Sequence, residues 1–204
     1  MEGAAADFRA ELSERLFVLY LGGRWMAPLS DRLIAVPGLP LARLACAEAG
    51  DVARARAGLK PARASGAALR AAYAASAPLL RALRAYEATG DPVAEPEDWT
   101  LPFAGPAVLV TATAVPLARV AGLLIAGAGQ GLLWKPAPGA APSAHALMGA
   151  LGPAAGAGLA MLQGDHATGV ALAGQGPVIW VSDAPPPAEM PVSLRVPATD
   201  PHRR

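Results

Sequence analysis

The sequence contains a single cysteine, Cys46, among its 204 residues. One cysteine excludes an internal disulfide bond and a metal cluster held by several cysteine thiolates. We expect Cys46 to be an ordinary half-buried thiol in the N-terminal part of the chain, far from any ligand-binding edge. The three histidines, His145, His166 and His202, lie in different predicted elements and lack acidic neighbours at metal-ligand spacing. No metal site is therefore predicted.

Neither sign of charge dominates, because 17 basic residues balance 16 acidic ones and the formal net charge is +1. The basic residues are dispersed, which gives no reason to expect nucleic acid as a partner. The longest nearly apolar stretch, 104–134, is interrupted by Arg119, Gln130, proline and several glycines. It is not expected to cross a membrane, and no membrane partner is predicted. The acidic N-terminus lacks the order of a secretory signal, so a cytoplasmic location is expected.

What the sequence does have is apolar residues, which make up 53% of the chain and are mostly alanine, leucine and valine. The mean hydropathy of +0.34 is too high for a disordered chain. A chain of this length can bury one sizeable core, built here from small side chains. We expect a single domain over residues 1–183, followed by a proline-rich tail over 184–204 that holds one possible strand, Val192–Val196.

The N-terminal part of the chain predicts short strands followed by helices. Apolar spacing favours an amphipathic helix at Asp7–Leu16. A β-meander is expected over residues 18–47, from strands at Phe17–Leu21, Arg32–Val36 and Leu41–Ala47. Helices follow within residues 51–90: the first runs from an N-cap at Asp51 to Leu59, and the second runs from an N-cap at Ser65 to about Thr89. Pro78 predicts a kink or break near Ser76, Gly90 ends the helical part, and a connector begins at Asp91.

From residue 106 to 183 strands and helices alternate. The predicted strands are Val108–Thr113, Gly131–Trp134, Ala160–Gln163 and Val178–Val181, and the predicted helices are Pro116–Ala128, Ser143–Leu151 and Thr168–Ala173. Strands that are apolar throughout and alternate with helices are typical of a parallel sheet covered on both faces. The predicted fold class is therefore α/β, with a Rossmann-like parallel sheet flanked by helices.

Several motifs, in their order along the chain, resemble the aldehyde dehydrogenase superfamily, in particular its N-terminal NAD-binding half. "LYLGGRW" at Leu19–Trp25 is similar to the family's opening strand, and "AEAGDVARARAG" and "YEATGDP" continue the match. The similarity is clearest in "GPAVLVTATAVPLARVAGLLIAGAGQGLLWKPAPGAAPSAHALMGAL", where the family has a strand, Pro-Trp-Asn-x-Pro, a helix, a strand, Lys-Pro-Ser and a helix. The resemblance covers nearly the whole chain and implies the family's sheet of parallel strands.

The resemblance also implies candidate cofactor-binding residues. Lys135 matches the lysine that hydrogen-bonds the adenosine ribose of NAD, although it could equally end a strand in solvent. Gly164 and Gly169 are similar to a glycine pair near the adenine pocket, and they form no P-loop. Ser182 stands at the strand end where the family binds the NAD pyrophosphate.

Three departures from the family pattern count against catalysis. Ala114 stands where the family has an asparagine that stabilises the oxyanion. Asp183 and the three prolines 185–187 replace the turn and helix that receive the pyrophosphate. Arg195 matches the general-base glutamate, and a guanidinium cannot accept a proton. The sequence is also expected to end before the half that carries the nucleophilic cysteine. Arg119, beside the Ala114 loop, is expected to be solvated.

The sequence therefore favours a non-catalytic, aldehyde-dehydrogenase-like protein with a structural or assembly role, without a bound cofactor. Its expected partner is a full-length aldehyde dehydrogenase or another copy of itself. The resemblance supports this, because a truncated domain of this kind in bifunctional proline-catabolic enzymes covers a substrate cavity. Two alternatives stay open. One is a module that binds NAD or another adenine nucleotide through Lys135, and the other is an aldehyde dehydrogenase completed by a partner subunit.

Overall fold

The computed structural model describes residues 15–199. A central sheet of seven strands has the order β10-β9-β6-β7-β8-β2-β3. Its strands are β2 (Leu19–Leu21), β3 (Arg24–Met26), β6 (Ala107–Thr111), β7 (Leu132–Pro136), β8 (Leu159–Met161), β9 (Val178–Val181) and β10 (Leu194–Val196). The five strands from β10 to β8 are parallel, and β2 and β3 complete the sheet in antiparallel pairing. The predicted α/β class is confirmed.

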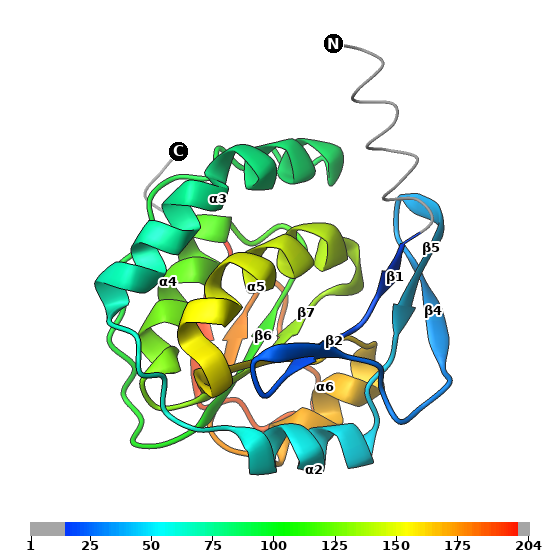
Figure 1. Cartoon of the computed structure of the whole chain (residues 1–204). Coiled ribbons are helices and arrows are strands. Elements are labelled where there is room, and N and C mark those ends of the chain that lie inside the picture. The colour runs from blue at the N-terminus through cyan, green and yellow to red at the C-terminus, as the bar shows by residue number, and fades with distance from the viewer. Residues whose placement is uncertain (1–14, 200–204) are drawn as a thin grey trace.

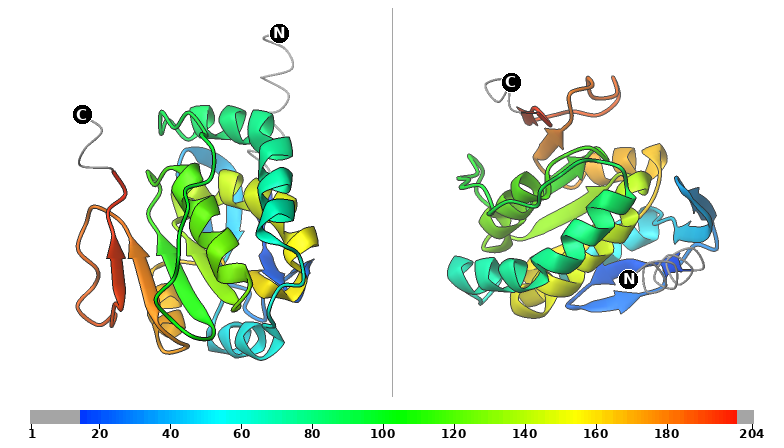
Figure 2. Two further views of the ribbon diagram at one scale, coloured as in Figure 1. Left: turned by 90° about the vertical axis from the view of Figure 1, so that its left-hand side faces the viewer. Right: turned by 90° about the horizontal axis from the view of Figure 1, so that it is seen from above.

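Helices cover both faces of the central sheet (Figures 1 and 2). One face carries α3 (Gly66–Tyr86), α4 (Leu117–Ala128) and α5 (Ala141–Ala155), and the other carries α2 (Ala49–Gly58) and α6 (His166–Ala173). All residues of β6, β7 and β8 are buried, as strands covered on both sides must be. Within the described part of the chain, no helix is long and apolar enough to span a membrane.

The two N-terminal helices begin close to their predicted positions. The Ser65 side chain accepts a hydrogen bond from the Ala68 backbone N–H at the start of α3, as predicted. In α2 the N-cap is Glu48 rather than Asp51, whose carboxylate instead accepts a hydrogen bond from the Glu48 backbone N–H in a reciprocal capping box. Pro78 lies inside α3, which is assigned as one helix, and its ribbon changes direction partway along, as the kink prediction requires (Figure 1).

The expected N-terminal strands are present, but two sheets share them. The β2–β3 hairpin extends the central sheet through β8. The other strands, β1 (Leu16–Phe17), β4 (Leu33–Val36) and β5 (Leu39–Ala45), form a separate sheet of order β1-β5-β4. This small sheet lies at one side of the molecule (Figure 1). The predicted helix Asp7–Leu16 lies mostly outside the described residues, and Leu16 itself begins β1.

The strand predicted in the proline-rich tail is the outer strand of the central sheet. β10 pairs in parallel with β9, with Arg195 opposite Trp180. The parallel strands therefore end along one edge, and their carboxyl ends are followed in sheet order by residues 197, 182, 112, 137 and 162. In open α/β sheets this is the edge where ligands bind.

Candidate functional site

Lys135 stands at the end of β7 and is only 6% exposed. It is opposite Val110 of β6 and lies on the sheet face that α6 covers. Burial lowers the pKa of Lys135 to about 8, although Asp165 and Cys46 act in the opposite direction. None of residues 15–199 accepts a hydrogen bond from the Lys135 ammonium. Lys135 is therefore a largely buried lysine at the ligand edge whose ammonium lacks a hydrogen-bond partner among residues 15–199, rather than a strand end in open solvent.

An ion pair lies beside this lysine. Arg32 Nη1 is 2.6 Å from Asp165 Oδ2, and the Asp165 carboxylate also accepts hydrogen bonds from the first turn of α6. The hydrogen bond from Arg32 is the main reason why the pKa of Asp165 falls to about 2. Asp165 is thus the N-cap of α6.

Cys46 is not where the sequence placed it. It is fully buried rather than half-buried; its side chain packs in the core of the small sheet, and it also borders Asp165 at the β8–α6 junction, so it is not remote from the ligand edge. The next residue, Ala47, donates its backbone N–H to the Gln163 carbonyl oxygen and accepts a hydrogen bond from the Thr168 hydroxyl. Burial raises the pKa of the Cys46 thiol, and the charges of Arg32 and Lys135 oppose this rise. The error arose because the segment that follows β5 runs directly to the end of β8, where Ala47 pairs with Gln163.

The two candidate glycines lie at this junction, and packing accounts for both. A Cβ at Gly164 would collide with the Thr168 side chain, which lies in the first turn of α6. A Cβ at Gly169 would lie 3.3 Å from the Met190 Cε and 4.0 Å from the Lys135 Cδ. Sequence reasoning missed Gln163, whose Oε1 is buried without a hydrogen-bond partner. Its place at the carboxyl end of a predicted parallel strand was the available signal.

The loop after β6 is held by a buried guanidinium that the sequence analysis did not identify. Arg84 of α3 is 1% exposed and donates hydrogen bonds to the carbonyl oxygens of Thr113 and Val115. These two residues flank Ala114, which is exposed in the turn. Arg84 also pairs with Glu87 and Asp91. The loop after β6 is thus held in place by Arg84 through its backbone carbonyl groups. At the position where the family has an oxyanion donor, this loop has only the methyl group of Ala114.

The edge beyond β9 is occupied by hydrogen bonds within the chain. The Asp183 carboxylate accepts hydrogen bonds from the backbone N–H groups of Ala198 and Thr199 and from the Thr199 hydroxyl. These bonds, the one from the Thr199 backbone first, lower the pKa of Asp183. Ser182 accepts a hydrogen bond from the Ala184 N–H, and no helix follows before β10. Arg195 is exposed on β10, next to this turn in a hollow of about 390 Å³.

Arg119 is buried, contrary to the expectation that it is solvated. It is 8% exposed, and its guanidinium donates hydrogen bonds to Glu97 and to the carbonyl oxygens of Pro197 and Ala198. It therefore joins α4 to the connector and to the segment after β10. The sequence position of Arg119, one turn into a predicted helix, did not indicate these partners, because they lie far away along the chain.

The structure brings together some of the predicted site residues and separates others. Lys135, Gly164 and Gly169 lie at the β7–β8–α6 junction. Ser182 directly follows β9, which lies two strands away from β7, and this corresponds to about 10 Å across the sheet. Ala114 and Arg195 are likewise separated by the intervening β9. Over residues 15–199, no three histidine, cysteine or acidic side chains are grouped to hold a metal ion.

The similarity to known proteins lies in the fold. No family model matches the sequence, and a search of curated proteins finds no match. A Burkholderia cenocepacia protein assigned as an aldehyde dehydrogenase matches with a TM-score of 0.62 and 22% identity, over 81% of this chain and 47% of that one. The Delta-pyrroline-5-carboxylate dehydrogenase of Mycobacterium tuberculosis matches with a TM-score of 0.62 and 18% identity, over 89% and 44%.

Proline utilization A from Bdellovibrio bacteriovorus matches with a TM-score of 0.63 and 14% identity, over 95% of this chain and 27% of that chain. The protein thus spans about half the length of the two dehydrogenases above and a smaller share of this longer enzyme. In each case the match covers most of this chain and concerns its fold. The chain therefore has the fold of part of an aldehyde dehydrogenase.

Proposed function

We propose that this protein is a non-catalytic aldehyde-dehydrogenase-like protein, a pseudoenzyme with a structural role. It assembles with a full-length aldehyde dehydrogenase or with a second copy of itself. The observation that carries the proposal is the chemistry of the carboxyl edge. Positions that need an amide donor and a proton acceptor hold Ala114 and Arg195, and the turn after β9 holds Asp183.

Each of these groups is unsuited to aldehyde oxidation. A methyl group donates no hydrogen bond to an oxyanion, and loss of one such donor removes about 2.7–4 kcal/mol of transition-state stabilisation. The Arg195 guanidinium stays protonated and cannot act as a base. Asp183 places a negative charge where the family binds phosphate, and the next residues form no helix with free N–H groups. These features support a role that needs no turnover.

A candidate assembly surface lies on the outer face of the small β1-β5-β4 sheet. Arg43 of β5 is opposite both Leu16 of β1 and Ala35 of β4, so their side chains share one face. Leu33 and Leu41 lie two residues along from this row and are 50% and 61% exposed. The opposite face is buried against α3 and α5. Three exposed leucines around one arginine form an apolar patch of the kind that marks protein interfaces.

The assembly role is tested by sedimentation. We expect the wild-type protein to form a dimer, or a complex with a full-length aldehyde dehydrogenase of the same organism, and Leu33→Glu to weaken it at least tenfold. Leu29→Glu is the matched control, because Leu29 is 67% exposed in a loop outside the small sheet. A wild-type protein that stays monomeric alone and with the dehydrogenase would contradict the proposal.

The absence of catalysis is tested separately. The purified protein, assayed with NAD and a panel of aldehydes, should give no turnover above background. Turnover by the protein alone would show that the matched positions at the edge are wrong. Turnover that arises only when a partner subunit is added would support the alternative of a partner-dependent dehydrogenase.

One observation favours a second function, the binding of an adenine nucleotide without chemistry. Lys135 is a largely buried residue whose ammonium has no hydrogen-bond partner among residues 15–199, and it stands at the edge of the sheet where ligands bind. Such an ammonium can bind hydroxyl groups of a ribose. Calorimetry with NAD and AMP tests this, with Lys135→Ala compared with Lys60→Ala, an exposed lysine. No heat at millimolar nucleotide would reject the nucleotide function.

A further inference from the structure

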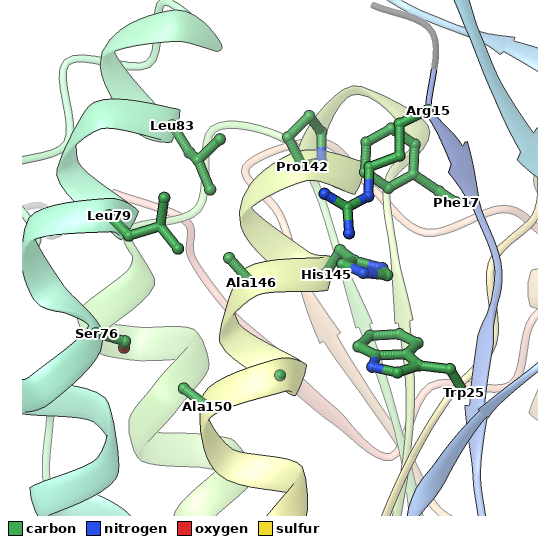
Figure 3. A pocket seen from close by; sticks show the side chains of 11 residues that line it. Arg15, Phe17, Trp25, Ser76, Leu79, Leu83, Pro142, His145, Ala146 and Ala150 are labelled. Carbon is green, nitrogen blue, oxygen red and sulfur yellow. The ribbon is translucent and has the colours of Figure 1, made fainter. Parts of the chain in front are cut away.

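A groove on the outer side of α5 lies away from the carboxyl edge. It has a volume of about 380 Å³, within the range of about 300–1,000 Å³ that is usual for small-molecule sites. Its floor consists of small residues of α5, including Ala146, Gly149 and Ala150. Leu79 and Leu83 of α3 line one side, and side chains from β1 and β3 line the other (Figure 3).

A column of three rings forms the second side. The imidazole of His145 stacks on Trp25 with a centroid distance of 3.8 Å and an angle of 17°. Phe17 meets the same imidazole edge-on at 5.7 Å. Because both neighbours fix the ring, His145 presents its nitrogen atoms in a defined direction (Figure 3). His145 Nδ1 is nevertheless buried, and none of residues 15–199 forms a hydrogen bond with it.

A buried nitrogen without a partner is uncommon in a native protein and points to a missing hydrogen-bond group. Burial, together with the charge of Arg15, lowers the pKa of His145 to about 4. The ring is therefore neutral at physiological pH, and its Nδ1 can carry the single proton and donate a hydrogen bond.

The charge of the groove has one sign. Among the lining residues that belong to the described part of the chain, Arg15 is the only charged side chain at neutral pH, and none is acidic. Arg15 is exposed, and no residue within 15–199 forms an ion pair with it. The guanidinium extends between Phe17 and His145, at the end of the groove where the rings lie (Figure 3). A single cation beside apolar walls is complementary to a monoanion with an apolar body.

We propose that this groove binds a small carboxylic acid with an aliphatic or aromatic body. Its carboxylate accepts hydrogen bonds from Arg15 and, once the surrounding side chains move aside, from His145 Nδ1–H, which is buried in the structure. Its apolar body lies along α5 against Leu79 and Leu83. A phosphate ester fits less well, because a dianion needs more donors than one guanidinium and one imidazole supply.

The test uses octanoate as the probe, with calorimetry and amide NMR on the full chain. Octanoate should bind saturably and shift the Trp25 indole N–H and the amide signals of Gly149 and Ala150. Octanol lacks the charge and acetate lacks the body, so both should bind at least tenfold more weakly. Equal affinity for octanol and octanoate, or no saturable binding, would overturn the proposal.

Two variants locate the site. Arg15→Gln should weaken octanoate binding about tenfold, which corresponds to the loss of one charge-assisted contact. Arg63→Gln is the matched control, because Arg63 is also exposed and does not line the groove. Ala150→Leu should block binding by narrowing the groove, with the helix preserved. Unchanged affinity in both Arg15→Gln and Ala150→Leu, with folded protein by circular dichroism, would place binding elsewhere and reject the assignment.

Discussion

At the scale of single residues, the carboxyl edge is dominated by buried charges with structural partners. Arg84 joins two carbonyl oxygens and two carboxylates, and Glu87 in turn accepts hydrogen bonds from the backbone and hydroxyl of Ser143. Burial raises the pKa of Glu87, against the effects of Ser143 and Arg84. A fully partnered buried network of this kind fixes the relative positions of α3, α5 and the β6 loop.

Lys135 differs from this network because it lacks a partner, and its replacement should therefore stabilise the fold. Lys135→Met keeps the apolar stem and removes the buried charge, so we expect the free energy of unfolding at pH 7 to rise by about 1–3 kcal/mol. The pKa of Lys135 is about 8 in the folded state and about 10.5 when unfolded. Between pH 8 and pH 10.5 the unfolded chain binds more protons than the folded one, so the free energy of unfolding of the wild type rises as the pH rises. The difference in stability between Lys135→Met and the wild type therefore becomes smaller at high pH.

Urea denaturation at pH 7 and pH 10 measures this difference. Lys60→Met is the control, since Lys60 is exposed and should change stability by less than about 0.5 kcal/mol. A Lys135→Met protein that is less stable than the wild type at pH 7 would mean that the ammonium has a stabilising partner.

His145 should make the fold sensitive to mild acid. Its pKa is about 4 when folded and about 6.5 when unfolded, so the unfolded chain binds more protons in this window. Stability is then lost as the pH falls from 6.5 towards 4. Discounted for partial exposure, the loss from this residue is about 1–2 kcal/mol. Between pH 7 and pH 4.5 the free energy of unfolding should decrease more for the wild type than for His145→Phe. An equal decrease in both proteins would contradict the assignment.

At the scale of secondary-structure elements, glycines set how closely helices approach their neighbours. A Cβ at Gly152 of α5 would collide with the ring of Tyr20 on β2. Gly149 lies on the same helix with nothing within 4 Å of the corresponding position. Because Gly152 lets α5 approach β2 closely, the β2–β3 hairpin can pack beside β8 in the central sheet.

These two glycines give a matched pair of substitutions. Gly149→Ala should stabilise the protein by up to about 1 kcal/mol, because alanine has the higher helix propensity. Gly152→Ala has the same intrinsic gain, yet overpacking against Tyr20 should make it destabilising by about 1–3 kcal/mol. Thermal denaturation of both variants measures this contrast, and equal effects would show that α5 and β2 can separate without cost.

At the scale of the whole molecule, the small β1-β5-β4 sheet leaves one apolar face uncovered (Figures 1 and 2). If the protein associates with itself there, its melting temperature must depend on concentration, because association stabilises the native state by mass action. We expect the melting temperature to rise as the protein concentration increases from far below the dissociation constant to about 100 times that constant, by an amount set by about 2.7 kcal/mol of linkage. Leu41→Lys should remove this dependence. A melting temperature independent of concentration would exclude self-association and leave the dehydrogenase as the partner.

Much of the fold could be predicted because the core strands are apolar throughout and are separated by helical patterns. The strands at residues 108, 132, 160, 178 and 194 and the helices α4, α5 and α6 lie within a few residues of their predicted bounds. Local signals also located the cap at Ser65 and the kink at Pro78. These features depend on neighbours in the chain, which a sequence shows directly.

The candidate site was only partly predictable. Lys135 was found because it follows a strand with a recognisable pattern. The hydrogen bonds of Arg84 and Arg119, the burial of Cys46 and the unpaired Gln163 depend on residues that lie tens of positions away in the chain. No periodicity or spacing contains that information. The division of the N-terminal strands between two sheets was missed for the same reason.

The sequence by itself determined the α/β class, the order of the elements and the side chains present at each strand end, because hydrophobic periodicity and covalent order are local properties. The tertiary structure decided which charges are buried, which of them have partners and which apolar face stays open. Those outcomes depend on the packing of distant segments, where desolvation and hydrogen bonding across the fold set the balance.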